Sequence, residues 1–293
     1  MRFTKTNRLS IAKQQSLTGW AFLALAVIML MIFLFYPMLK GLIWSFQGSD
    51  GFTLNNYKRV FQDPTLRKAV KNTSFYVFVE LCIMLPLALI MAAVLQQKDL
   101  KLRGLFRTLL FVPCVMALMS YATVFKIMFG NYGLINSLLK LLGIVQEPYE
   151  FLTSTSGAVL VVSICLVWRW AGYNMVFYCT GFSNIDSTIY EAASIDGATG
   201  IQSFFKITVP LLKPVILLTM IMSVNGTLQI MDEIYQLTNG GPANNTLSIS
   251  LYIYNTAFSG VPKFAYACAQ SFVLLVVIAL LTALQLKVGD KRD

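Results

Sequence analysis

Two apolar stretches of this sequence carry polar and aromatic side chains at spacings that place them on one side of a helix. Trp170, Tyr173 and Asn174 recur at i, i+3 and i+4, and Ser223 and Thr227 are four residues apart. Amide and hydroxyl groups beside aromatic rings suit a ligand that presents hydroxyl groups and apolar C–H faces. The stretches therefore predict a binding set made up of Trp170, Tyr173, Asn174, Ser223, Asn225, Thr227 and Gln229. Such groups also join neighbouring helices by hydrogen bonds, and the spacing leaves both roles open.

Few of the groups that catalysis or metal binding requires are present. The chain has no His, which excludes Ser-His-Asp triads, His metal sites and His general bases. Its five Cys lie inside apolar runs without a C-x-x-C pair, as expected of small packing residues. No G-x-x-x-x-G-K-[ST] segment occurs, so the chain lacks the loop that cradles ATP phosphates. We expect a non-catalytic chain that itself binds no cofactor and no metal.

Arg169 is a charged residue inside an apolar stretch. A guanidinium within a membrane must be paired or hydrated, because its burial alone is costly. Glu80, Asp232 and Glu233 are the candidate partners. The interpretation we favour is a structural ion pair with one of them, rather than a contact with a ligand.

The composition is that of a membrane protein. The chain is 57% hydrophobic and 12% charged, whereas soluble domains carry about 25% charged residues. Its net charge of +10 is interpreted as topology, because Lys and Arg of membrane proteins gather in cytoplasmic loops. No aromatic-plus-basic motif indicates nucleic-acid binding.

Spans of about 20 mainly apolar residues can cross a bilayer, and backbone groups within lipid must be paired, which favours helices. The predicted fold is therefore an all-α integral membrane protein with a single transmembrane domain over residues 1–293. It has six transmembrane helices, at about 17–39, 72–95, 105–129, 156–182, 209–231 and 264–286.

The distribution of Lys and Arg favours both termini on the cytoplasmic side. Arg2, Lys5, Arg8 and Lys13 precede the first predicted span, as the positive-inside rule requires. The outer segment 40–71 breaks the rule, because it also carries several basic residues. We expect this segment to form short helices along the outer membrane face, interrupted at Asp63-Pro64.

The segment 183–213, between the predicted fourth and fifth spans, has the pattern of a helical hairpin. Asp186 or Ser187 can cap a first helix, and Gly197 suits its left-handed end. Thr199 and Gln202 form a capping-box pattern for a second helix. Ile189, Ala192 and Ala193 are expected to share one flat face of the first helix. With six spans and a cytoplasmic N-terminus, this hairpin lies in the cytoplasm.

The hairpin resembles the EAA loop of the membrane subunits of ABC importers. Glu191, Ala192, Ala193, Gly197, Ile207 and Pro210 fall in the register of that motif, and Val209 stands where the family usually has Leu. A second stretch, Thr238-Asn239-Gly240-Gly241-Pro242 followed by Thr246, Tyr252-Ile253-Tyr254 and Ala257-Phe258, is similar to carbohydrate permeases of the MalF/UgpA type. The resemblance extends over about 17–286.

The resemblance implies a permease subunit of an ATP-driven importer for a sugar or oligosaccharide. It implies that Glu191 and the other motif residues couple to a separate dimer of ATP-binding subunits, which hold ATP and Mg. It also implies a second, non-identical permease subunit, an extracellular or periplasmic sugar-binding protein and contacts of the spans with membrane lipid. In relatives of the MalF type, residues of the fourth and fifth spans touch the sugar.

Three alternatives remain at this point. One is an ABC importer for a solute other than a sugar. Another is an ion-coupled secondary transporter, which needs acidic residues at mid-membrane, and Glu80 is the carboxylate well inside a span. The third is an intramembrane enzyme, for which the absence of His leaves little chemistry.

Overall fold

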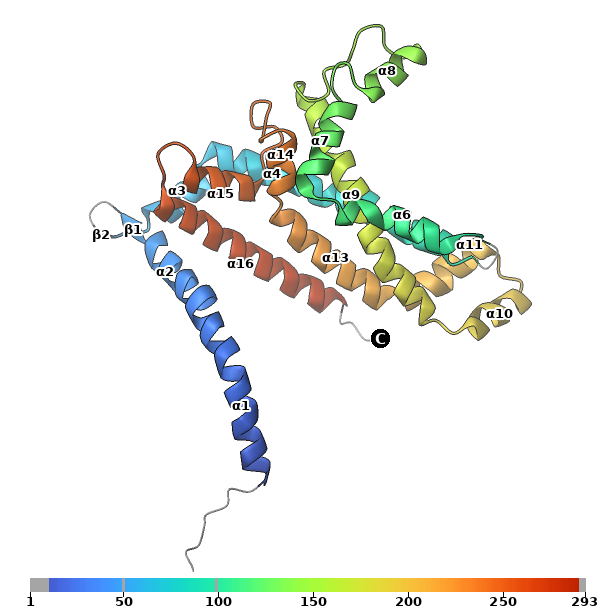
Figure 1. Cartoon of the computed structure of the whole chain (residues 1–293), viewed down its shortest axis with the longest axis horizontal. Coiled ribbons are helices and arrows are strands. Elements are labelled where there is room, and N and C mark those ends of the chain that lie inside the picture. Colours follow the sequence, from blue (N-terminus) through green and yellow to red (C-terminus); the bar gives the residue numbers. More distant parts are fainter. Residues whose placement is uncertain (1–10, 49–50, 98–99, 290–293) are drawn as a thin grey trace, which may run out of the picture.

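The computed structural model describes residues 11–48, 51–97 and 100–289, and these are mainly helical (Figure 1). Arg2, Lys5 and Arg8, which entered the predicted orientation, lie outside the described residues. The α-helices are α1 (Ile11–Leu30), α2 (Tyr36–Ser45), α3 (Asn55–Gln62), α4 (Pro64–Val79), α5 (Leu85–Leu95), α6 (Arg103–Val115), α7 (Leu118–Met128), α8 (Leu134–Leu141), α9 (Thr155–Ser183), α10 (Ser187–Ile195), α11 (Gly200–Ser203), α12 (Val209–Leu211), α13 (Lys213–Leu228), α14 (Asp232–Leu237), α15 (Ile249–Phe258) and α16 (Phe264–Gly289).

Three π-helical turns are inserted between α-helices, at η1 (Met31–Phe35), η2 (Glu80–Met84) and η3 (Phe204–Thr208). Two short antiparallel strands, β1 (Gln47–Gly48) and β2 (Gly51–Phe52), pair Gln47 with Phe52. Turns of this wide type are frequent at functional sites. The turn η2 begins at Glu80, the carboxylate singled out in the sequence.

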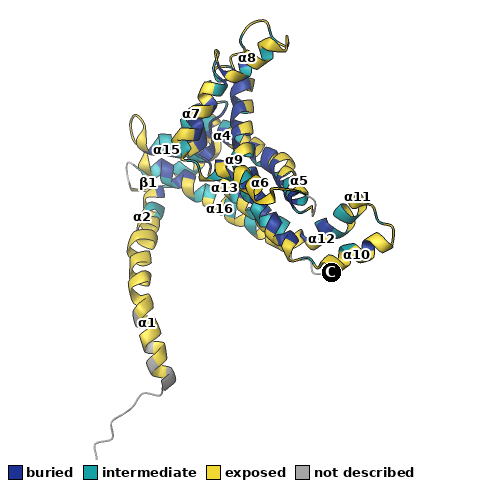
Figure 2. Cartoon of the chain, turned by 45° about the vertical axis from the view of Figure 1, so that its right-hand side comes forward, coloured by how far each residue is buried: buried dark blue, intermediate teal, exposed yellow. Residues whose placement is uncertain are grey.

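The first helical rod, α1 to α2, leaves the rest of the molecule at its N-terminal end (Figure 1). Its large apolar side chains are exposed along most of its length (Figure 2). Only α2 packs closely on the bundle, against α16, where a Cβ on Gly41 would lie 3.8 Å from the sulfur of Cys268. This rod covers the predicted span 17–39 and continues beyond both of its ends.

The central bundle consists of α4 to α5, α9, α13 and α16. Buried residues of α5 and α9 form one apolar cluster near the hairpin, and a larger cluster joins α4, α7, α9 and α15 at the other end. Helices α6 and α9 cross in close contact at Gly172, where a Cβ would lie 1.8 Å from the carbonyl oxygen of Leu110. Small residues permit such close approach of membrane helices.

The described residues contain four helices long and apolar enough to cross a membrane, or up to six if each of two bent pairs is one span. The pair α6 and α7 bends by 97°, and the segment from α11 to α13 bends by 69°. The predicted spans 105–129 and 209–231 are therefore not straight. Pro210 and Pro214 occupy early positions of α12 and α13, where a missing N–H costs little.

Within segment 40–71 a short helix is present as expected, α3, but the prediction of a second short helix after Pro64 is wrong. Residues 66–70 belong to α4, which continues through η2 and α5, so this rod begins eight residues before the predicted start at 72. The reason is Asp63, whose carboxylate accepts hydrogen bonds from the backbone amides of Thr65 and Leu66 and so starts a new helix. Pro64 occupies the first turn of that helix, where it is compatible with helix continuation.

Candidate functional site

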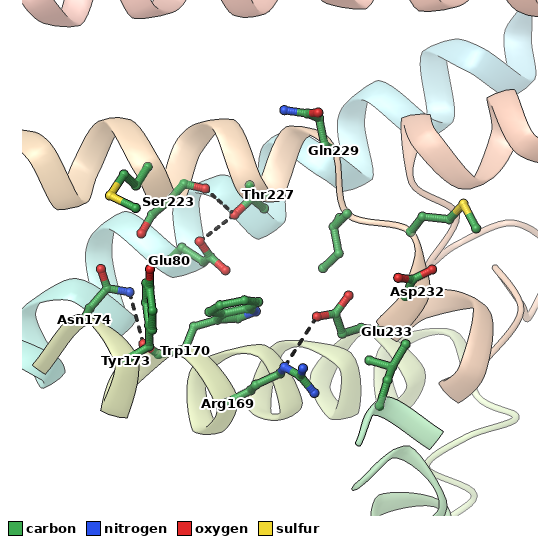
Figure 3. A pocket seen from close by; sticks show the side chains of 15 residues that line it. Glu80, Arg169, Trp170, Tyr173, Asn174, Ser223, Thr227, Gln229, Asp232 and Glu233 are labelled. Atoms are coloured by element: carbon green, nitrogen blue, oxygen red, sulfur yellow. Dashed lines mark hydrogen bonds and ion pairs between the residues drawn. The ribbon is translucent and has the colours of Figure 1, made fainter. Parts of the chain in front are cut away.

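A cavity of about 490 Å³ lies between the start of η2, the middle of α9 and the segment in which α13 ends and α14 begins (Figure 3). Its polar and aromatic lining residues are Glu80, Arg169, Trp170, Tyr173, Asn174, Ser223, Thr227, Gln229, Asp232 and Glu233. Six of the seven binding residues expected from the sequence are in this set. The structure thus brings both predicted stretches to one site.

Asn225 is the predicted binding residue that does not line the cavity. Its side-chain oxygen accepts a hydrogen bond of 3.1 Å from the hydroxyl of Thr282 on α16. A residue two positions from Thr227 points about 200° around the helix, so the two cannot face the same way. For Asn225 the structure supports the role of joining helices.

The aromatic wall of the cavity comes from one face of α9. The rings of Trp170 and Tyr173 meet edge to face with centroids 5.6 Å apart. One turn further, the side-chain amide of Asn174 donates to the carbonyl oxygen of Trp170 over 3.0 Å. Because the two rings brace one another, they form a fixed apolar surface beside polar groups.

The opposite wall is held by a hydrogen bond between two spans. The hydroxyl of Thr227 on α13 donates to the carboxylate of Glu80 on η2, which is 4% exposed. Helix α13 ends one residue later, at Leu228, and α14 starts at Asp232 after an irregular segment at residues 229–231. This break places Gln229 and Asp232 among the lining residues of the cavity. Hydrophobic periodicity could not reveal it, since an uninterrupted helix was expected over 209–231.

Arg169 lies at one end of the cavity, and its partner is Glu233. The Nε atom of Arg169 is 3.9 Å from a carboxylate oxygen of Glu233, and its guanidinium lies 4.5 Å from the centre of the Tyr121 ring. The predicted ion pair is thus confirmed for one of its three candidate partners. Glu80 is instead hydrogen-bonded to Thr227.

The second predicted site, the hairpin 183–213, projects from one end of the bundle (Figure 2). Asp186 caps α10 by accepting from the amide of Thr188 over 3.0 Å. Gly197 has φ of +77°, and the amide of Ala198 donates to the carbonyl of Ala193, which is a Schellman end. Thr199 and Gln202 form the reciprocal bonds of the predicted capping box.

Within the hairpin, the face that Ile189, Ala192 and Ala193 share on α10 is only partly open. Ile189 and Ala192 are exposed, whereas Ala193 is buried, so the three residues do not present one open surface. The hydroxyls of Tyr190 and Thr208 are 2.9 Å apart and tie α10 to η3. Glu191 is exposed, as a contact with another protein requires. Ile207 is half-buried and Pro210 is exposed.

The two sites lie on the same helices. Helix α9 carries Trp170 and Tyr173 in its middle and ends at Ser183, just before α10. Helix α13 starts directly after the hairpin and carries Ser223 and Thr227 to the cavity. The hydroxyl of Tyr178 on α9 is 2.8 Å from that of Thr219 on α13, which links these helices between the two sites. The two sites are therefore connected by continuous helices.

Comparison with known proteins places the chain in a family. The model of the family described as "binding-protein-dependent transport system inner membrane component" matches residues 66–290. The lactose transport system permease protein LacF of Rhizobium radiobacter is 42% identical over 98% of this chain and 99% of the relative. The multiple sugar-binding transport system permease protein MsmF of Streptococcus mutans is 33% identical over 94% of this chain and 96% of the relative.

The fold is shared with a solved transporter. A chain in the crystal structure of a bacterial ABC transporter involved in the import of the acidic polysaccharide alginate superposes with a TM-score of 0.87. That match has 21% sequence identity and covers 96% of this chain and 97% of the other. The relatives are transport permease subunits and are not catalytic. By the family match and by the identity of its relatives, this chain belongs to the inner-membrane components of binding-protein-dependent transport systems.

Proposed function

We propose that this chain is one permease subunit of an ATP-driven importer for a sugar or oligosaccharide, and that it forms half of the translocation pathway. The observation that carries the proposal is the hairpin, a capped and hydrogen-bonded unit at one end of the helices that line a sugar-compatible cavity. The permease relatives named for lactose and for multiple sugars support the cargo class. The chain crosses the membrane six times, each bent pair counting as one span, with both termini in the cytoplasm.

In the proposed cycle, the hairpin is the contact through which an ATPase dimer moves the spans. Binding of ATP and Mg closes the ATPase dimer, the hairpins of two permease subunits approach one another, and the cavity opens outward. An external sugar-binding protein then delivers the sugar, and hydrolysis resets the cycle. A second, non-identical permease subunit supplies the facing wall of the pathway. Glu191 is the expected partner of a basic residue on the ATPase.

The experiment is affinity purification of the tagged chain from membranes, followed by an ATPase assay of the complex across a sugar panel with the binding protein present. We expect an ATPase to co-purify and a sugar to stimulate its turnover. Glu191→Ala should uncouple turnover from sugar, whereas Glu147→Ala, an exposed carboxylate outside the hairpin, should not. Retained coupling in Glu191→Ala would contradict the docking role.

Two further arms separate the alternatives. Stimulation only by a solute other than a sugar would keep the ABC mechanism and change the cargo. Uptake that survives deletion of the ATPase but is abolished by an uncoupler would favour an ion-coupled transporter, in which Glu80 would be the acidic group to examine first.

A further inference from the structure

The charges that face the cavity are unequal. Its lining contains the carboxylates of Glu80, Asp232 and Glu233 but a single cationic side chain, that of Arg169. The ion pair at 3.9 Å balances Arg169 against Glu233. Two carboxylates therefore remain without a cationic partner among the described lining residues, and one remains even when Glu80 carries a proton.

Part of the Arg169 guanidinium is also inaccessible from the cavity. The guanidinium of Arg169 is stacked over Tyr121, and its Nε and Nη1 atoms are shut off from solvent. An anionic ligand could not reach these atoms without displacing Glu233 or the ring. Asp232, by contrast, is an exposed residue of the cavity lining (Figure 3).

We propose that Glu80 and Asp232 make this cavity selective for uncharged sugars, and that they disfavour sugars bearing a carboxylate or a phosphate. This inference rests on the proposed function, since it concerns the cargo of the same site. Carboxylates accept strong hydrogen bonds from sugar hydroxyls. Because the walls of the cavity have a low dielectric constant, the same carboxylates repel an anion there more strongly than they would in bulk water. One pair of side chains thus attracts the favoured ligand class and repels the other.

The potential in the cavity can be measured without knowing the sugar. Gly226 lines the cavity and a Cβ there would have nothing within 4 Å, so Gly226→Cys fits. In the assembled transporter, with native cysteines replaced by Ala, its modification rates are compared for cationic, neutral and anionic methanethiosulfonates. Tyr132→Cys, at a residue 97% exposed outside the cavity, is the matched control.

We expect the ratio of cationic to anionic rates at Gly226→Cys to exceed that at Tyr132→Cys at least fivefold in low salt. The excess should shrink when Glu80→Gln and Asp232→Asn are introduced, singly and together, and also in 1 M salt, where the screening length falls to about 3 Å. An equal ratio at the two positions, or one favouring the anionic reagent, overturns the proposal.

A second arm uses sugars as protectants, with the binding protein omitted so that only the permeases select. Each neutral disaccharide of the panel, lactose included, is paired with its derivative oxidised to a carboxylate at C6. Neutral sugars should slow the reaction of the neutral reagent with the cysteine of Gly226→Cys. The oxidised derivatives should need at least tenfold higher concentrations for the same protection. Equal protection by both members overturns the charge selection. If no sugar protects, the cavity does not select the ligand and this inference fails, whereas sugar-stimulated ATPase turnover with the binding protein present tests the proposed function separately.

Discussion

The hydroxyl of Thr227 on α13 lies 2.5 Å from the carboxylate of Glu80 on η2 and joins two spans beside the cavity. Both residues are almost fully buried. The same hydroxyl lies 2.8 Å from the carbonyl oxygen of Ser223 in the preceding helical turn. The bond therefore ties Glu80 to the last turn of α13, directly before the helix breaks.

Removing the hydroxyl of Thr227 should weaken this tie. Thr227→Val keeps the side-chain shape but leaves a buried carboxylate without its donor, so we expect a loss of about 1–2 kcal/mol in the free energy of unfolding. Glu80→Gln should cost less, because its amide can still bond the hydroxyl. Thermal unfolding of the detergent-solubilised transporter measures both. Thr108→Val, at an exposed threonine of α6, is the control and should have little effect.

Because Arg169 and Glu233 form an ion pair, the losses in the free energy of unfolding caused by replacing each of them should be strongly non-additive. Arg169→Met should cost about 3–5 kcal/mol, because it leaves a buried and uncompensated carboxylate. Adding Glu233→Gln should restore much of the loss, since the double variant has neither charge. Unfolding of the two single variants and the double variant forms the cycle. If the loss in the double variant equals the sum of the losses in the two single variants, the two groups do not stabilise one another. Arg67→Met, at an exposed arginine, is the control and should change stability little.

Asp63 predicts a dependence of stability on pH. Burial by itself raises the pKa of Asp63, but the hydrogen bonds from the hydroxyls of Tyr252 and Tyr266, each 2.7 Å long, and from two backbone amides outweigh it. The pKa therefore lies below its ordinary value of 3.8. The stabilising contribution is complete above that value and is lost as pH falls through the lower, folded-state pKa.

Because Asp63 joins α4, α15 and α16, Asp63→Ala should cost about 2–4 kcal/mol at neutral pH, the sum of a lost helix cap and lost charge-assisted bonds. The difference from the unchanged protein should shrink toward pH 3. Unfolding measured between pH 3 and 7 tests both statements. Asp186→Ala removes an exposed cap alone and should cost less. A pH-independent difference would contradict the role of the ionised carboxylate.

The close contact at Gly172 predicts that adding a side chain there destabilises the protein, and Gly104 on α6 provides the comparison. A Cβ at this position would lie 1.8 Å from the backbone oxygen of Leu110, so Gly172→Ala must push α6 away from α9. We expect a loss of about 3 kcal/mol or more, at the upper end of overpacking effects. Gly104→Ala on α6 meets nothing within 4 Å and should be neutral or slightly stabilising in the same unfolding assay. Similar losses in both variants would contradict the close crossing.

Much of the local structure could be read from the chain. The capping of α10 by Asp186, the left-handed Gly197 and the capping box of Thr199 and Gln202 all appear as predicted. These features depend on residues within four positions of one another, so the type of residue and its spacing are sufficient. The long apolar helices were predictable for a related reason, because the length of an apolar run sets whether it can cross a bilayer.

Other features were decided by tertiary packing. Which acid pairs with Arg169, the break before Asp232 and the direction of Asn225 depend on how α9, α13, α16 and η2 bend and rotate against one another. A helix with apolar residues on all sides carries no sequence signal for the face that meets its neighbours. The partners of polar groups inside the spans are therefore set by contacts between residues far apart in the chain, as between Glu80 and Thr227.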